Sequence, residues 1–379
     1  MKSQKFLIVL MLFFTVNSFA QNARFSQIGT AAIQFNPSLT GRFDGKIRLS
    51  ALSSWQETNA ASMEHQNVSL DAKFGKYKSS GDDESTTALS ASSASSQKEG
   101  KDEVYKKSRV YGYWGAGLNY YHYGNSKSPL DAKFFSASIA RHFYNKSNKM
   151  FGFGIQATYA EGKLDETKGS EYDREISGGG FRYPFTYAVD PQKGSNNYID
   201  FNGGGYYGMV TDAVMFEIGG AMHHLAYPKN DPRGNVDNES KLRHRVTAHS
   251  ILRLRLNKNW GIVQKNMYWQ EGMYYRSTKL NGDSAQIVAF WSGLEFYKVN
   301  PVGKINVNYG IYTRNFQTIM PYLNINLGKI ANLRYSYEMP INSKKYTAYT
   351  AKRNEVALIF TYKRYTSPGT RFYKKVNFW

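Results

Sequence analysis

The stretch INVNYGIYT at 305–313 alternates apolar and polar residues with a period of two. Three later stretches continue the pattern: YLNINL at 322–327, NLRYSYE at 332–338 and EVALIFTY at 355–362. A period of two places all the apolar side chains on one face of a pleated strand. A soluble sheet shows the same alternation, so other features must indicate the environment of these strands.

The N-terminus indicates where the chain is sent. Lys2 and Lys5 precede an apolar run over 6–16, and Ser18-Phe19-Ala20 supplies small residues for cleavage before Gln21. This pattern predicts a secretory signal peptide over residues 1–20. No later stretch approaches the ~20 apolar residues of a transmembrane helix. We therefore expect an exported protein without a helical anchor, which is either a soluble β-protein or a barrel.

The composition favours the barrel. The chain of 379 residues contains 30 Tyr, 23 Phe and 33 Gly, and its mean hydropathy is −0.56. These values suit strands that are apolar on one side only, with aromatic residues at the membrane interfaces. Cys is absent, so no disulfide framework is expected despite export. No linker rich in Pro or Gly divides the chain, which favours a single domain.

The formal net charge of +20 would suggest nucleic acid as a partner of a cytoplasmic protein. Export removes most of that interpretation, and no nucleic-acid partner is expected. Lys and Arg are instead expected in the lumen, at the rims and against the anionic head groups of outer-membrane lipid. A basic surface that receives an acidic partner is the alternative.

The sequence contains about fourteen strand candidates. Their approximate bounds are 45–55, 65–75, 111–123, 133–144, 150–162, 198–209, 213–225, 244–256, 260–269, 284–297, 303–312, 318–327, 330–338 and 354–363. We expect an all-β fold, a single-chain transmembrane antiparallel β-barrel of about 14 strands in the outer membrane.

The connections between these candidates alternate in length. Five are expected as tight turns: 145–149, 210–212, 257–259, 298–302 and 328–329. Five are expected as longer loops: 122–131, 163–197, 226–243, 270–283 and 339–353. Short periplasmic turns that alternate with long external loops are typical of outer-membrane barrels, and both termini are then expected in the periplasm.

Three segments lie outside this regular pattern. Residues 77–108 should be a short periplasmic turn but form a long Ser-rich stretch, which predicts a disordered periplasmic insertion within a barrel over 44–364. Residues 21–43 precede the first strand and are expected as a periplasmic or plug segment. Residues 365–379 form a C-terminal tail. The insertion is either a tolerated extension or a contact for a partner.

The sequence offers few residues for chemistry. We predict no enzyme, no catalytic residue, no cofactor and no metal site, because the seven His are scattered and no nucleophile or zinc motif is present. His223 and His224 are adjacent, and adjacent strand residues point to opposite faces, so a structural role at the rim is expected. Arg48 and Asp71 share the inward face of the first two strands and predict a structural ion pair.

Several short segments carry a resemblance to a known family. Phe25-Ser26-Gln27 is followed by an eight-residue spacer and then by 36–41, NPSLTG. This spacing resembles the F-S-Q and N-P-x-x-x-G opening of the PorP/SprF family of type IX secretion system outer-membrane proteins of Bacteroidota. Trp55 falls where that family has the Trp of its R-x-Q-W segment, and 68–71, VSLD, resembles the strand that follows and ends in Asp.

The other segments occur in the family's order further along the chain. The stretch HHLAYPK at 223–229 resembles H-H-L-x-x-P-K, Arg314 ends a stretch similar to Y-R, YSYE at 335–338 resembles Y-S-Y-D, and Asn354-Glu355 stands where the family has H-E. The sequence departs from the family at 28–32, which lacks a second aromatic-Asn-Pro unit, in the 77–108 insertion and in the tail.

The resemblance implies a gliding-related or secretion role. It implies a non-enzymatic barrel that assists the secretion or surface attachment of proteins such as large gliding adhesins. The implied partners are type IX machinery proteins, either periplasmic ring and stalk components or the translocon, together with a large secreted adhesin. A porin-like channel for small solutes is the alternative. The residues that the family motifs mark as candidates for partner docking are Phe25, Ser26, Gln27, Asn36, Pro37, Gly41, Trp55, Asp71, His224, Pro228 and Arg314.

The segment 25–41 is the best functional candidate among them. It can serve as a plug that packs the lumen, as a docking site for a partner, or as both. The sequence leaves open whether the lumen is plugged, and whether the protein belongs to the core machinery or serves one adhesin.

Overall fold

A computed structural model describes most of the chain. The described residues are 25, 27, 29–43, 45–57, 62–77, 110–124, 130–145, 149–165, 193–211, 214–229, 241–242, 244–256, 267–280, 283–299, 305–314, 318–327, 330–341 and 352–362. The predicted signal peptide, the core of the 77–108 insertion, most of 163–197 and the C-terminal tail lie outside this set, as does Ser26.

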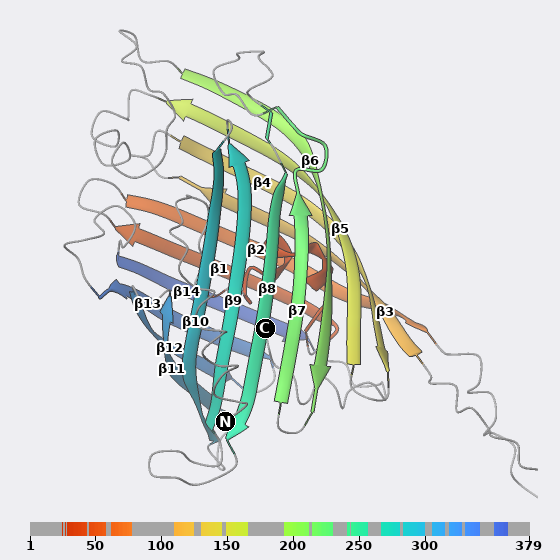
Figure 1. The fold of residues 1–379 in the computed structure, drawn as a ribbon, viewed down its shortest axis with the longest axis vertical. Helices are drawn as coiled ribbons and strands as arrows, with labels where there is room; N and C mark the ends of the chain where they lie inside the picture. Colours follow the sequence, from red (N-terminus) through yellow and green to blue (C-terminus); the bar gives the residue numbers. More distant parts are fainter. Residues whose placement is uncertain are drawn as a thin grey trace, which may run out of the picture.

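The described residues form fourteen antiparallel strands in one closed barrel (Figure 1). Each strand pairs with its neighbours in sequence, and β1 closes the ring by pairing with β14 from Ile47↔Tyr362 to Glu57↔Lys352. The strands are β1 Ile47–Glu57, β2 Ser62–Tyr77, β3 Val110–Tyr123, β4 Leu130–Asn145, β5 Lys149–Asp165, β6 Lys193–Val210, β7 Val214–His223, β8 Arg245–Leu256, β9 Met267–Leu280, β10 Asp283–Val299, β11 Ile305–Arg314, β12 Thr318–Leu327, β13 Ala331–Pro340 and β14 Lys352–Tyr362. The predicted barrel of about fourteen strands is confirmed.

The ninth strand was placed wrongly. The sequence suggested 260–269, whereas β9 runs from Met267 to Leu280 and pairs with β8 and β10 along its length. Gln270, Glu271 and Gly272 interrupt the apolar pattern and therefore looked like a loop. A ladder is held by backbone hydrogen bonds, so these residues pair with β8 all the same.

The error also reverses two predicted connections. The connection expected to be tight at 257–259 spans 257–266, and the long loop expected at 270–283 is reduced to 281–282. We call the barrel end that carries the connections 166–192 and 224–244 the loop end, and the opposite end the turn end. β1 begins and β14 finishes at the turn end, because Ile47 pairs with Tyr362.

The outside of the barrel is apolar. Along β5 the side chains of Phe153 and Ile155 are 62% and 65% exposed, while the alternate residues Gly154 and Gln156 face inward and are buried. Exposed apolar residues recur on the outward face of most strands, among them Leu118, Phe201, Ile311 and Tyr362. A belt of this size would be unstable in water and matches the lipid-facing band of a membrane barrel.

The inside of the barrel is polar, and the segment before β1 lies within it. This segment forms one turn of helix, α2 Ala32–Phe35, and a short 3-10 turn, η1 Pro37–Leu39. In Figure 1 the red segment lies within the ring of strands. No helix in the described part of the chain is long and apolar enough to cross a membrane.

Candidate functional site: a luminal segment anchored to the barrel wall

The described residues from Phe25 to Phe43, which we call the luminal segment, contact the barrel wall on several sides. Gln27 donates from Nε2 to the Ser336 hydroxyl at 3.1 Å, on β13. On another part of the wall, the Thr247 hydroxyl of β8 donates to the carbonyl of Phe35 at 3.2 Å. The Ser50 hydroxyl of β1 donates to the carbonyl of Thr30 at 3.3 Å. The segment therefore joins strands that are far apart around the ring.

The segment also supplies part of the apolar core. Leu39 is fully buried in a cluster with Tyr113, Met150, Tyr206, Ala32, Val210 and Met215. At its other end, Phe25 packs edge-on against His65 and Tyr121, with ring centroids 6.1 and 5.9 Å apart. Removal of the segment would uncover both clusters, so it contributes to the packing of the lumen.

Asn36 fixes the middle of the segment. Its Oδ1 accepts from the Ser38 amide at 2.9 Å and from the Ser38 hydroxyl at 2.7 Å, which caps η1, and Pro37 occupies the first turn of η1. Its Nδ2 donates to the carbonyls of Gly205 and Gly220 on β6 and β7, at 3.2 and 3.3 Å. Asn36 is fully buried, so one side chain both shapes the turn and attaches it to the wall.

The wall beside this turn is made of glycine. A Cβ at Gly154 would lie 2.5 Å from the carbonyl oxygen of Pro37, and a Cβ at Gly204 or Gly115 would overlap Asn36 or Thr40. These glycines face inward on β5, β6 and β3. The backbone of the segment can approach the wall closely only because these strands carry no side chain there.

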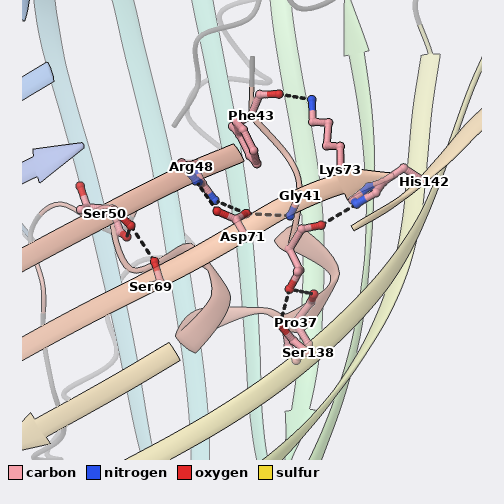
Figure 2. Close-up of polar contacts among 12 residues, drawn as sticks. Pro37, Gly41, Phe43, Arg48, Ser50, Ser69, Asp71, Lys73, Ser138 and His142 are labelled. Atoms are coloured by element: carbon pink, nitrogen blue, oxygen red, sulfur yellow. Dashed lines mark hydrogen bonds and ion pairs between the residues drawn. The ribbon is translucent and has the colours of Figure 1, made fainter. Parts of the chain in front are cut away.

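Gly41 is held by the predicted ion pair. Arg48 donates to Asp71 from Nε and Nη2, both at 2.9 Å, and the Gly41 amide donates to Asp71 Oδ2 at 2.8 Å (Figure 2). Asp71 is 1% exposed. Gly41 has φ +77°, which an L-residue rarely adopts. The paired guanidinium stabilises the carboxylate, and the third bond fixes the turn into β1.

His142 on β4 hydrogen-bonds to the same turn. Its Nε2 donates to the Thr40 carbonyl at 2.7 Å, because a carbonyl only accepts, and its Nδ1 bonds the Tyr206 hydroxyl at 2.7 Å. The Thr40 hydroxyl is 2.8 Å from both the Pro37 carbonyl and Ser138 Oγ. Lys73 donates to the carbonyl of Phe43 (Figure 2).

A second buried charge cluster involves Arg42, the residue after Gly41. Arg42 forms an ion pair with Glu217 on β7, and Glu217 Oε1 lies 3.3 Å from Nε2 of His249. The Arg42 guanidinium also lies over the ring of Tyr206, 4.8 Å from its centroid. Arg42 and Glu217 are 3% and 0% exposed, so the pair is removed from water and depends on its partners.

The structure gathers only part of the sequence-predicted set. Phe25, Gln27, Asn36, Pro37, Gly41 and Asp71 all lie in or against the luminal segment. Trp55 faces outward and is 38% exposed, Pro228 is buried in the connection after β7, and Arg314 is the last residue of β11. Ser26 lies outside the described residues.

Sequence reasoning missed Arg42, Glu217, His142 and the glycines of the wall. Glu217 is the single charged residue in VMFEIGGAMH of β7, and Arg42 follows the family motif directly. Both were visible signals. The glycines could not be recognised as the contact surface of the luminal segment, since their partners lie more than 60 residues away in sequence.

His224 lies apart from this site, at the loop end. Its Nδ1 is 2.9 Å from Asp200 Oδ2 on β6, and its φ of +62° places it in the left-handed region. The neighbouring His223 is buried, and its Nε2 lies 3.3 Å from the Thr247 hydroxyl. Among the described residues no group of three or more His, Asp or Glu is arranged to hold a metal ion.

A closed barrel with an apolar outer belt and a polar inner face that holds its own N-terminal segment is an outer-membrane β-barrel. The sequence matches the family described as "Type IX secretion system membrane protein PorP/SprF" over residues 17–360. The chain belongs to this family, and family membership implies association with the type IX secretion machinery. This confirms the resemblance that the sequence segments indicated.

Other comparisons find only distant similarity. No curated protein sequence matches the chain. The translocator domain of the autotransporter NalP from Neisseria meningitidis is 11% identical, with 89% of this chain and 96% of that one covered and a TM-score of 0.39. The toluene transporter TbuX from Ralstonia pickettii is 11% identical, with 90% and 95% covered and a TM-score of 0.41. Likenesses with scores this low carry no argument about this chain.

Proposed function

We propose that this barrel is a non-enzymatic accessory of type IX secretion that binds a protein partner and assists the secretion or surface attachment of a large adhesin. The observation that supports this most strongly is the luminal segment. Its anchors reach β1, β2, β4, β6, β7, β8 and β13. So many bonds between the segment and the wall oppose its displacement, which a solute path through this part of the lumen would need.

The energetics support the same proposal. Two buried charge clusters and the fully buried Asn36 hold the segment, and removing one partner from such a cluster leaves an uncompensated group inside the barrel. Spontaneous release of the segment is therefore costly. The porin-like alternative requires either such a release or a path beside the segment, and we favour the accessory role for this reason.

The proposed orientation places the turn end in the periplasm. The barrel sequence starts and finishes there, so residues near either terminus can reach periplasmic ring, stalk or translocon proteins. The loop end would then face the medium, where a secreted adhesin is met. The family resemblance supports both kinds of partner.

A deletion strain tests the proposal. Whole cells with and without the gene are treated with protease, and the released type IX substrates are compared by mass spectrometry while uptake of small solutes is measured. We expect one or more large adhesins to be lost from the surface with uptake intact. Normal display of every substrate would contradict the proposal.

A further inference from the structure

The luminal segment runs lengthwise through the barrel, from the loop end to the turn end. β2 starts at the loop end with Ser62. Phe25 packs against His65, three residues from that start, with ring centroids 6.1 Å apart. The Gly41 amide donates to Asp71, which lies six residues closer to the turn end on the same strand (Figure 2). The two ends of the segment therefore lie at different levels of β2.

β3 gives the same direction. The ring of Phe25 also packs against Tyr121, two residues from the loop end of β3, with centroids 5.9 Å apart. A Cβ at Gly41 would lie 2.7 Å from the Cα atom of Gly115, six residues closer to the turn end than Tyr121. Both strands place the N-terminal part of the segment near the loop end and its C-terminal part near the turn end.

The N-terminal part is bonded to the wall at this level. The Gln27 amide donates to Glu355 Oε2 at 3.0 Å, and its Nε2 donates to the Glu355 carbonyl at 3.3 Å. Glu355 is fully buried and lies three residues from Lys352, where β14 begins at the loop end. The position of Phe25 and Gln27 is thus set by side-chain packing on one part of the wall and by hydrogen bonds on another.

The level of Phe25 limits where a mature N-terminus can lie. The predicted cleavage before Gln21 leaves four residues ahead of Phe25, and four residues span at most about 14 Å. The loop end of β2 is three residues from His65, or about 10 Å. The turn end of β2 at Tyr77 is twelve residues from His65, or about 40 Å. Such an N-terminus can reach the loop end and cannot reach the turn end.

We propose that the signal peptide is removed before Gln21 and that the mature N-terminus opens at the loop end of the barrel. This replaces the expectation of a periplasmic N-terminus, which followed from an even number of strands without the path of the chain ahead of β1. The residues just before Ile47 and the tail after Tyr362 remain at the turn end, where they can make the periplasmic contacts proposed above.

The path gives the segment one free end and one tethered end. The bond from Gly41 to Asp71 holds the tethered end beside β1, whereas Phe25 and Gln27 are the described residues of the segment that lie nearest the loop end. A molecule that arrives at the loop end therefore displaces Phe25 and Gln27 before it reaches Asn36. With the loop end facing the medium, the segment is released from outside the cell.

The test uses single cysteines in the full-length protein in cells, since the chain has none of its own. Ala23→Cys reports the N-terminus, Ala226→Cys marks the loop end after β7, and Thr211→Cys marks the turn end between β6 and β7; Ala226 and Thr211 are both exposed. A membrane-impermeant maleimide is applied to intact cells and to cells with a permeabilised outer membrane. We expect Ala23→Cys to follow Ala226→Cys within about twofold in both, and permeabilisation to raise the labelling of Thr211→Cys alone by at least about tenfold.

The outcomes separate this inference from the proposed orientation. If Ala23→Cys and Ala226→Cys are both protected in intact cells while Thr211→Cys is labelled, the N-terminus lies at the loop end and the proposed orientation fails. Labelling of Ala23→Cys together with Thr211→Cys, or only after denaturation, would overturn the proposal. A mass of the purified protein that includes the signal peptide would overturn it as well. Barrel level is measured by immunoblot, and Asn22→Cys replaces Ala23→Cys if the latter is depleted.

Discussion

Loss of the Arg42–Glu217 ion pair should loosen the luminal segment without opening the barrel. Both side chains are buried, at 3% and 0% exposed. Breaking a buried pair costs about 3–5 kcal/mol because a charge is left uncompensated. In Arg42→Met, Glu217 keeps its contact with His249 at 3.3 Å. We therefore expect the attachment of the luminal segment to weaken by the lower end of this range, about 3 kcal/mol. At about 1.4 kcal/mol per factor of ten, the open population should rise about 100-fold.

The assay uses the absence of cysteine from the chain. Ser38→Cys places one thiol at a position with no exposed surface, and its rate of modification by a maleimide reports how often the segment leaves the wall. Arg42→Met in this background should be modified about 100 times faster. Arg42→Met/Glu217→Leu removes both charges and should return most of the way to the reference rate.

An exposed ion pair on β5 supplies a matched control. Lys163 and Glu161 form an exposed pair at 3.5 Å, with side chains 57% and 31% exposed. Lys163→Met removes a cation in the same way and should leave the modification rate unchanged. A rate in Arg42→Met within about twofold of the reference would refute the view that this pair holds the segment.

Other predictions concern the inward-facing glycines of the wall, the turn at Gly41 and the topology. Gly204→Ala should release the segment and speed the same modification at least tenfold, because its Cβ overlaps Asn36, whereas Gly203→Ala has only Leu225 and Gly154 at 3.8 and 3.9 Å and should not. Gly41→Ala should lower the melting temperature of the purified barrel, since φ of +77° costs an L-residue about 1–2 kcal/mol; an unchanged value would contradict the strained turn. Protease added to whole cells should cut within 163–197 and spare 77–108, and the reverse result would invert the proposed orientation.

The sequence predicted the barrel because its signals are local. Alternation with a period of two survives in each strand, and thirteen of the fourteen expected ranges overlap the observed strands closely. β9 failed because Glu271-Gly272 broke the alternation while the backbone ladder continued. A pattern of side chains cannot report a hydrogen bond between main chains.

The site was predictable only in part. The family motif drew attention to Asn36 and Gly41, and the alternation of the first two strands predicted the Arg48–Asp71 pair, which the structure confirms. The contact surface for the segment depends on Gly154 and Gly204, which are paired with each other across β5 and β6. No local pattern reveals which of the 33 glycines will face the segment.

The central claim is that the N-terminal segment fills the lumen and that the barrel binds protein instead of passing solutes. Conductance of the purified full-length barrel in a planar bilayer tests it most directly, with Gly204→Ala measured beside it. We expect no stepwise openings from the wild-type barrel and openings from the variant. Stable open-channel steps from the wild-type barrel would contradict the account.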